Sequence, residues 1–166
     1  AEKRGLPNAK TTPEALKAYE TEKAIKLFEK YAVLSKKELL SRYEIYMHNY
    51  KSVISYEAEC ARTIAATQIL PAALQHQANL GATVRAVKEA GAGTTKTAEG
   101  ALVEVSGLID NLSSAIKAID AALDAGSVDK MKASMLDARK AADALEGIVP
   151  AELWPLPTYA QMLFLY

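Results

Sequence analysis

The sequence predicts an all-α fold, in which three long helices form an antiparallel up-down bundle with coiled-coil character. Short helices are expected before the bundle, and a proline-rich tail that ends in a short helix is expected after it. The first observation is composition: half of the 166 residues are hydrophobic, whereas only 8 are Gly and 6 are Pro, a balance that favours helix. The second is that apolar residues recur at spacings of three and four, while the alternation typical of strands is nearly absent. The third is that capping residues separate the periodic stretches.

Residues 1–34 are predicted to be a lead-in segment that is helical in part. Thr12 is the expected N-cap, and Pro13 follows at the first helical position, where its missing N–H removes no helical hydrogen bond. The apolar residues expected to make contacts in this segment are Ile25, Leu27, Phe28, Tyr31 and Val33.

A bundle domain is predicted over residues 35–149, and its first long helix runs from Ser35 to about residue 90. Ser35 and Glu38 have the spacing of a capping box. One apolar stripe consists of Tyr43, Met47, Tyr50, Ile54, Ala58, Ala61, Ala65 and Ile69, and a second of Leu39, Tyr46, Val53, Cys60 and Ile64. A helix with two stripes packs on more than one neighbour. Pro71 is expected to kink this helix, because its ring removes one hydrogen bond and clashes with the carbonyl four residues earlier.

Two further long helices are predicted over about residues 94–124 and 127–149. Gly126 is the expected C′ residue of the first and Ser127 the expected N-cap of the second, so a short link joins antiparallel neighbours. The first seam is Leu102, Val105, Ile109, Leu112, Ile116, Ile119 and Leu123; the second is Val128, Met131, Met135, Ala138, Ala142, Leu145 and Val149. Both repeat at alternating spacings of three and four, the pattern of left-handed helix packing.

The tail, residues 150–166, is predicted to be a docking segment. Its three prolines forbid a continuous helix, but Thr158 and Gln161 have capping-box spacing for a short terminal helix. The candidate docking residues are Trp154, Leu156, Tyr159, Met162, Leu163 and Phe164. Because burial of a large apolar side chain is worth roughly 1.5–3 kcal/mol, we expect the tail to dock on the bundle or on protein outside this chain.

The charge balance and the cysteine content exclude several classes of protein. Lys and Arg together number 20, as do Asp and Glu, so no net field favours nucleic acid or an anionic membrane as a partner. No apolar run approaches the length of a membrane span. A single cysteine, Cys60, rules out an internal disulfide and favours a reducing compartment. Because the N-terminus has neither an initiator Met nor a signal-peptide layout, we expect the chain to be a piece of a longer protein.

The stretch AGAGTTKTAEG at residues 90–100 has the glycines and the lysine of a phosphate-binding P-loop, but its local chemistry argues against nucleotide binding. A P-loop of the Walker A type needs Gly directly before its Lys, and here Thr95 precedes Lys96. It also follows a strand, whereas the preceding residues have a helical pattern. Gly91 and Gly93 are better explained as a helix C-cap and a hairpin turn, with Thr94 or Thr95 capping the next helix.

Other candidate sites are weaker. Glu44 and His48 share a helix face, but no third or fourth metal ligand has suitable spacing. Cys60 is interpreted as a small buried hydrophobe. The tyrosines at positions 43, 46, 50 and 56 are interpreted as interhelical packing, with an aromatic binding cleft as the alternative. The prediction is therefore that this chain holds no catalytic, cofactor-binding or metal-binding residue.

Long runs at the two ends of the chain agree in order and spacing with a known family. They are AEKRGLPNAKTTPEAL at the start, EKAIKLFEKYAVLSKKELLSRYEIYMHNYKSVISYEA after it, then ILPA, and ELWPLPTYAQMLF near the end. These runs closely resemble the C-terminal region of type III glutamine synthetases, over about residues 1–75 and 150–164, with a break near 58–67. Residues 76–148 match only as helix of similar polarity, and LKAY and MHNY depart from the family's wording.

The resemblance implies a parent enzyme that makes glutamine from glutamate, ammonia and ATP through a γ-glutamyl phosphate. It implies ATP and a divalent metal (Mg or Mn) bound upstream, and none in this chain. The implied partners are the catalytic domain of the same chain and the other subunits of a double-ring dodecamer in the cytoplasm. This chain would be a structural and oligomerisation domain that is not catalytic by itself. The alternative is a free-standing helical module for protein interaction, against which the abrupt start and the apolar tail argue.

Overall fold

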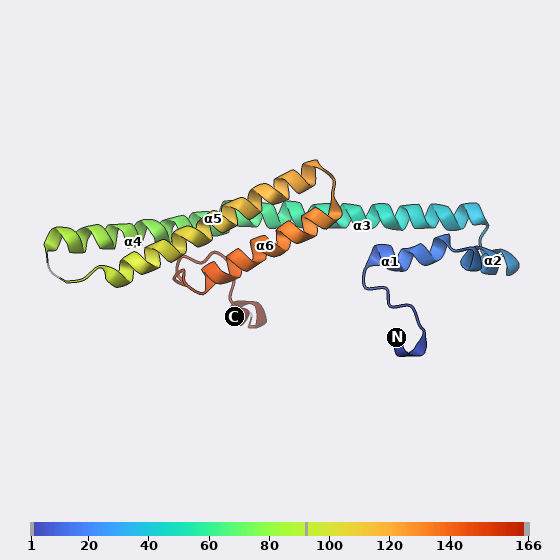
Figure 1. Ribbon diagram of the computed structural model, residues 1–166, viewed down its shortest axis with the longest axis horizontal. Coiled ribbons are helices and arrows are strands. Elements are labelled where there is room, and N and C mark those ends of the chain that lie inside the picture. Colours follow the sequence, from blue (N-terminus) through green and yellow to red (C-terminus); the bar gives the residue numbers. More distant parts are fainter. Residues whose placement is uncertain (1, 92, 165–166) are drawn as a thin grey trace. The chain divides into compact units, whose positions relative to one another are not determined.

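A computed structural model describes residues 2–91 and 93–164, and every regular element in these ranges is helical, as predicted (Figure 1). The short N-terminal elements are the 3₁₀ turn η1 (Glu2–Arg4), α1 (Thr12–Leu16), the 3₁₀ turn η2 (Lys17–Glu20) and α2 (Glu22–Lys30). The long elements are α3 (Lys36–Ile64), α4 (Leu70–Ala90), α5 (Lys96–Asp124) and α6 (Val128–Glu146). A π-helical turn, η3 (Ala65–Ile69), joins α3 to α4, and the short α7 (Tyr159–Leu163) ends the fold.

Packing divides the chain into two compact units, one reaching Ile54 and the other beginning at Ser55. This division falls inside α3, whereas the domain limits predicted from the sequence, 34/35 and 149/150, follow local capping and proline signals. Those limits stay predictions. The two units are described separately below.

The first unit has well-capped helices but almost no core. Among residues 3–54, Leu39 is the one buried side chain. The short η2 turn packs on α3, since Tyr19 and Tyr46 meet edge to face with ring centroids 6.0 Å apart. Of the apolar contacts predicted in the lead-in segment, Ile25 and Phe28 are half-buried. The predictions for Leu27, Tyr31 and Val33 are wrong for this unit, because nothing in it covers these three side chains and they are exposed.

The helix starts in the first unit follow the sequence signals closely. At the start of α3, the Glu38 carboxylate accepts hydrogen bonds from the Ser35 backbone N–H (2.8 Å) and hydroxyl (2.7 Å), and the Glu38 N–H donates back to Ser35 Oγ (3.3 Å). The predicted capping box is therefore confirmed. At the start of α1 the N-cap is Thr11 rather than Thr12, because the Thr11 hydroxyl accepts from the Glu14 N–H. This change places Pro13 at the second helical position.

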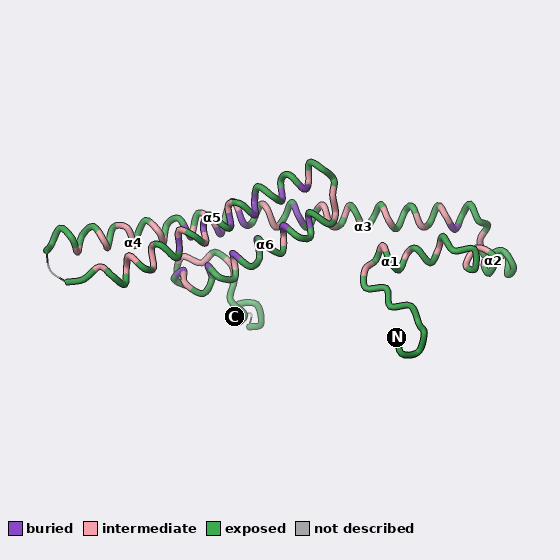
Figure 2. Tube along the Cα trace, viewed as in Figure 1, coloured by how far each residue is buried: buried purple, intermediate pink, exposed green. Residues whose placement is uncertain are grey.

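The second unit is built on three helical segments that lie side by side (Figure 1). They are α4 with the η3 turn, α5 and α6. The prediction of an antiparallel bundle of long helices is confirmed. The residues buried in its main cluster are Ala65, Ile69, Ala73, Val105, Ile109, Leu112, Ile116, Ala141, Leu145 and Val149. Figure 2 shows buried positions in purple along α5 and α6.

Pro71 does not end the helical run, because the turn before it is wider than an α-turn. In η3 the Leu70 N–H donates to the Ala65 carbonyl five residues earlier, and α4 continues through Pro71 from that point. A π turn re-spaces the carbonyls that a proline ring would otherwise contact and tolerates the missing N–H. The disturbance predicted at Pro71 therefore takes the form of a π turn.

The link between α5 and α6 is a glycine-terminated hairpin. Gly126 has a φ of +60°, its N–H donates to the Leu123 carbonyl (2.9 Å), and the Ser127 N–H donates to the Ala122 carbonyl (3.1 Å). These two bonds form a Schellman motif, which places Gly126 at the C′ position as predicted. Ser127 is the N-cap residue of α6, although its side chain makes no capping hydrogen bond.

The predicted α6 seam is rotated slightly in the structure. Met131, Ala138, Leu145 and Val149 are buried, but Met135 and Ala142 are only half-buried, whereas Ser134 and Ala141 are buried in their place. The Ser134 hydroxyl donates to the Lys130 carbonyl (2.8 Å), so this buried polar group is satisfied within its own helix. Small side chains at these positions allow α5 and α6 to approach each other closely.

Candidate docking surfaces

The first part of the tail packs on the bundle. Leu153, Trp154 and Leu156 are half-buried against the main cluster of the second unit. A turn at Pro150, whose carbonyl accepts from the Leu153 N–H (2.9 Å) and the Trp154 N–H (3.1 Å), aims these side chains inward. The indole N–H of Trp154 is buried and has no hydrogen-bond acceptor among the described residues. The structure therefore places two of the six candidate docking residues, Trp154 and Leu156, against the chain's own core.

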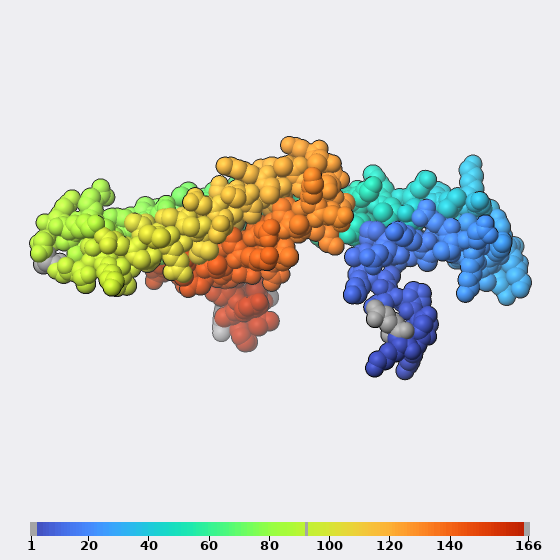
Figure 3. Space-filling view, viewed as in Figure 1, coloured from blue at the N-terminus to red at the C-terminus, as the bar shows by residue number. Residues whose placement is uncertain are grey.

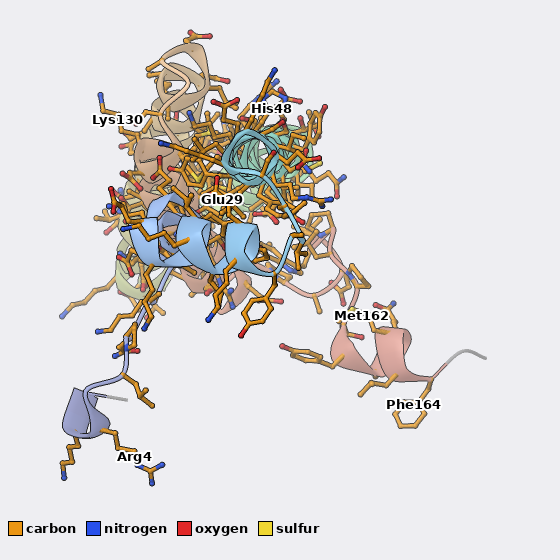
Figure 4. All side chains as sticks on the ribbon, turned by 90° about the vertical axis from the view of Figure 1, so that its right-hand side faces the viewer. Arg4, Glu29, His48, Lys130, Met162 and Phe164 are labelled. Carbon is orange, nitrogen blue, oxygen red and sulfur yellow. The ribbon has the colours of Figure 1, made fainter. Side chains whose placement is uncertain are left out.

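The last part of the tail is a formed helix whose large apolar side chains are exposed. The Thr158 hydroxyl accepts from the Gln161 N–H (3.3 Å), and the Gln161 side chain accepts from the Thr158 N–H (2.7 Å), so the predicted capping box is confirmed. Tyr159 is 80% exposed and Leu163 72% exposed, and Met162 and Phe164 are exposed as well. Figure 3 shows the C-terminal segment protruding below α6, and Figure 4 shows Phe164 pointing away from the bundle.

These four side chains, Tyr159, Met162, Leu163 and Phe164, are called the α7 patch below. The segment from Thr158 to Phe164 carries no charged side chain. A contiguous apolar patch rimmed by polar residues is typical of an interaction site, and positions i, i+3 and i+4 of a helix are the usual anchors of a helix that docks in a groove. The arrangement can therefore bind an apolar surface, and it has no chemistry for catalysis.

A groove of about 750 Å³ lies between α5 and α6. Its floor is formed mostly by small residues: Ala115, Ala118, Ala121, Ala122, Ala133, Ser134 and Ala141. Lys130, Asp137 and Lys140 line its edge, and the Lys140 ammonium lies 3.0 Å from Asp137 Oδ1. No motif in the sequence marks this surface, although its alanines recur at helical spacing beside the large residues of the seams.

The glycine-rich stretch at residues 90–100 is a helix-to-helix turn. Gly91 ends α4 with a φ of +62°, Gly93 has a φ of +91°, and Thr95 is the N-cap residue of α5; Ala92 lies outside the described residues. Across this turn the Lys88 ammonium contacts Glu99, and that hydrogen bond is the main reason why the pKa of Glu99 is lowered, with a second contribution from the Thr95 hydroxyl. The interpretation as a turn is therefore confirmed for the described residues.

The remaining candidates do not converge on a site. Within residues 2–91 and 93–164 the structure holds no cluster of His, Cys, Asp and Glu that could bind a metal ion. His48 is exposed. The prediction that Cys60 is buried is wrong, because the face of α3 that carries it has no neighbour in its unit. Tyr43 is half-buried beside Glu20, and desolvation, followed by the hydrogen bond to Glu20, raises its pKa. Tyr46 packs edge to face on Tyr19, and Tyr56 is exposed.

Comparison with known proteins shows what kind of chain carries these surfaces. A family model described as the glutamine synthetase C-terminal domain matches residues 1–88, more than half of the sequence. The chain belongs to this family. The match covers the whole first unit and continues into α4, while α5, α6 and the tail lie beyond it.

Two curated relatives of this glutamine synthetase C-terminal domain extend the similarity to the tail. A protein named type-3 glutamine synthetase from Dictyostelium discoideum is 33% identical over 187 aligned residues, which take in 99% of this chain and 25% of that protein. A glutamine synthetase from Butyrivibrio fibrisolvens is 27% identical over 177 aligned residues, again with 99% of this chain and 25% of that protein. The chain thus spans about 25% of the length of these relatives.

Among the helices in the described ranges, none is long and apolar enough to cross a bilayer.

Proposed function

We propose that this chain is the C-terminal structural domain of a type III glutamine synthetase and that it takes no direct part in the reaction. The observation that carries the proposal is the alignment. Relatives named as glutamine synthetases match nearly all of this chain with only a quarter of their own length.

In this proposal the rest of the enzyme supplies the reaction. It ligates ammonia to glutamate through a γ-glutamyl phosphate, with ATP and Mg or Mn bound upstream of this chain. The enzyme works in the cytoplasm as a homo-oligomer of two stacked rings. The chain described here supports the catalytic part of its own subunit and contributes to contacts between subunits.

The apolar tail supports the proposed structural role. Trp154 and Leu156 are held on the bundle, which fixes the place from which α7 extends. The α7 patch is left uncovered, and covering each of its large side chains is worth roughly 1.5–3 kcal/mol. We propose that the catalytic part of the same subunit covers the α7 patch.

The test uses the full-length protein that contains this chain. A double variant, Met162→Lys with Leu163→Lys, is compared with Ala160→Lys, which adds a charge to the same helix outside the α7 patch. We expect the double variant to lower the thermal midpoint and the rate of glutamine formation, and Ala160→Lys to leave both nearly unchanged. Equal stability and activity in all three proteins would contradict the role of the tail.

A second experiment tests the absence of catalysis. The purified 166-residue chain is incubated with glutamate, ammonia, ATP and magnesium, and glutamine and phosphate are measured. We expect neither product above the blank. Glutamine formation by this chain alone would overturn the proposal.

A further inference from the structure

The two compact units of the chain carry opposite net charges. The first, which reaches Ile54, has 11 Lys and Arg against 7 Asp and Glu, and the second, which begins at Ser55, has 9 against 13. The first unit therefore has a net charge of +4 and the second of −4, while the chain as a whole is neutral. Charge divided in this way favours contact between the first unit of one molecule and the second unit of another.

In the first unit, the outer face of α2 combines apolar and basic side chains. Leu27 is 53% exposed and Tyr31 is 65% exposed, and their spacing of four places them on one side of the helix. By the same spacing Lys23 and Lys30 lie on that side and Lys26 lies at its edge, and all three lysines are exposed. These five side chains are called the α2 face below.

The acidic residues of α2 lie away from this face. By helical spacing Glu22 and Glu29 are on the far side of the helix from Leu27. Glu22 pairs with Lys26, with 3.1 Å between Oε2 and Nζ. Among the residues that the structure describes, the other two lysines of the α2 face make no ion pair. The face is therefore an apolar centre with an excess of positive charge around it.

In the second unit, the outer face of α5 has an apolar centre with the opposite charge. Val103 is 73% exposed, and Gly100 and Gly107, three residues before and four residues after it, have open space beside them. No side chain of these two neighbours blocks the approach of a partner to Val103. The basic residues of α5, Lys96 and Lys117, lie outside the stretch 97–116. The charged residues within that stretch are all acidic: Glu99, Glu104 and Asp110.

Two of these three carboxylates are available to a partner. Glu99 is already paired with Lys88 of α4. Glu104 and Asp110 are exposed and make no ion pair within the described ranges. Arg85 is the other basic residue of α4, so this part of the surface keeps an excess of negative charge. Val103, Glu104 and Asp110 are called the α5 face below.

The two faces are complementary to each other and not to themselves. Each has exposed apolar side chains at its centre, but lysines surround those of the α2 face and carboxylates those of the α5 face. Two α2 faces, or two α5 faces, would bring like charges together, and such a contact is selected against. A contact between two different faces of the same chain is heterologous, and repetition of such a contact can close a ring of subunits.

We propose that the α2 face of one copy of this chain docks on the α5 face of a second copy. Leu27 and Tyr31 of the first copy pack on Val103 of the second, and the lysines of one face lie opposite the carboxylates of the other. This inference deepens the proposed contribution to contacts between subunits and rests on it. The α7 patch has no part in it, since that patch is proposed to contact the catalytic part of its own subunit.

The first test reverses the charges of each face in the full-length protein. One variant carries Lys23→Glu with Lys30→Glu, another carries Glu104→Lys with Asp110→Lys, and a third carries all four changes. We expect each reversal alone to raise the concentration at which half of the protein is assembled by about tenfold or more. The third variant should recover most of the loss, because its faces again have opposite signs. Sedimentation over a range of concentrations measures the effect.

A matched control separates this contact from the net charge of the unit. Lys3→Glu with Lys10→Glu changes the charge of the first unit equally but lies outside α2, and it should leave assembly unchanged. An equal loss in this control, no loss in either reversed protein, or no recovery in the third variant would overturn the inference.

A second measurement asks directly whether the two faces meet between copies. Full-length chains with Leu27→Cys are co-expressed with chains that carry Val103→Cys, both with Cys60→Ser, and are treated with a short thiol-reactive cross-linker. A peptide that joins positions 27 and 103 can then come only from two different copies. By mass spectrometry we expect it to be at least about tenfold more abundant than the 27–27 and 103–103 products, because like faces repel.

Equal amounts of the three cross-linked products, or none that joins positions 27 and 103, would overturn the inference. The proposed function would survive either result, because the tail variants and the activity assay test it independently.

Discussion

The Lys88 ammonium lies 2.7 Å from Glu99 Oε1 and thereby joins the last turn of α4 to the first turn of α5. The same carboxylate group accepts from the Thr95 hydroxyl at 3.0 Å. These contacts join the two helices across the turn, and the lysine of the glycine-rich stretch itself, Lys96, takes no part in them.

The first prediction concerns this ion pair and pH. The lowered pKa of Glu99 means that its ionised form stabilises the fold. The stabilisation is present above the carboxyl's ordinary pKa of 4.5 and is lost as the pH falls through the lower folded pKa. We expect Glu99→Gln to lower the urea midpoint only slightly at pH 7, because the pair is exposed, and we expect this difference to shrink as the pH falls below 4.5. A difference that stays the same as the pH falls would show that the charge is not responsible.

The second prediction concerns the centre of the bundle. Leu112 is fully buried in the main cluster, so Leu112→Ala should lower the free energy of unfolding by about 2–5 kcal/mol through lost burial and a cavity. Val103 lies on the same helix and is mostly exposed, so Val103→Ala should change it by less than about 0.5 kcal/mol. Chemical denaturation measures both. Similar losses in the two variants would mean that α5 presents a different face to the core.

The third prediction compares the effect on stability of replacing each of two glycines of the bundle by alanine. Gly126 has a φ of +60° at the end of α5, and Gly126→Ala should cost about 1–2 kcal/mol because an L side chain is strained there. Gly107 lies within α5 with open space around it, and Gly107→Ala should stabilise the protein by about 0.5–1 kcal/mol. Opposite signs in thermal melts are the expected result, and a destabilising Gly107→Ala would contradict the helix placement.

The fourth prediction concerns Trp154, the single tryptophan. Because Trp154 is half-buried against the main cluster, its fluorescence maximum should be blue-shifted in the folded chain and move to that of solvated indole in urea. Val149 is buried in the same cluster, so Val149→Ala should move the folded maximum part of the way. A red maximum in the folded chain would mean that the tail leaves the bundle in solution.

Local signals in the sequence predicted the helices and most of their ends. The capping boxes at Ser35 and Thr158 and the C′ glycine at position 126 each involve residues within a few positions of one another, so spacing alone reveals them. The α5 seam was equally visible, since its large residues fill one face at regular spacing.

The surfaces were harder to predict, because burial depends on which neighbours are present. Cys60 and Val53 lie on an apolar stripe in the sequence, yet both are exposed. An apolar stripe indicates that a helix face favours burial, but it does not identify the neighbour that would bury it. The floor of the groove between α5 and α6 could not be predicted from the sequence. An alanine such as Ala118 is as typical of high helix propensity as it is of close helix packing.

The π turn before Pro71 changes how positions must be counted along the helix. The buried residues Ala58, Ala65, Ile69 and Ala73 are separated by seven, four and four positions. A heptad repeat would place seven positions between Ala65 and the residue two steps later. The observed interval from Ala65 to Ala73 is eight, one position longer. The turn absorbs that extra residue. Downstream it sets the phase that brings Gln77 to Ser106 of α5, with 2.8 Å between Nε2 and Oγ. If the heptad repeat continued from Ala58 without the extra residue, His76 and Asn79 would face the neighbouring helix. The one inserted position therefore determines which face of α4 packs in the bundle.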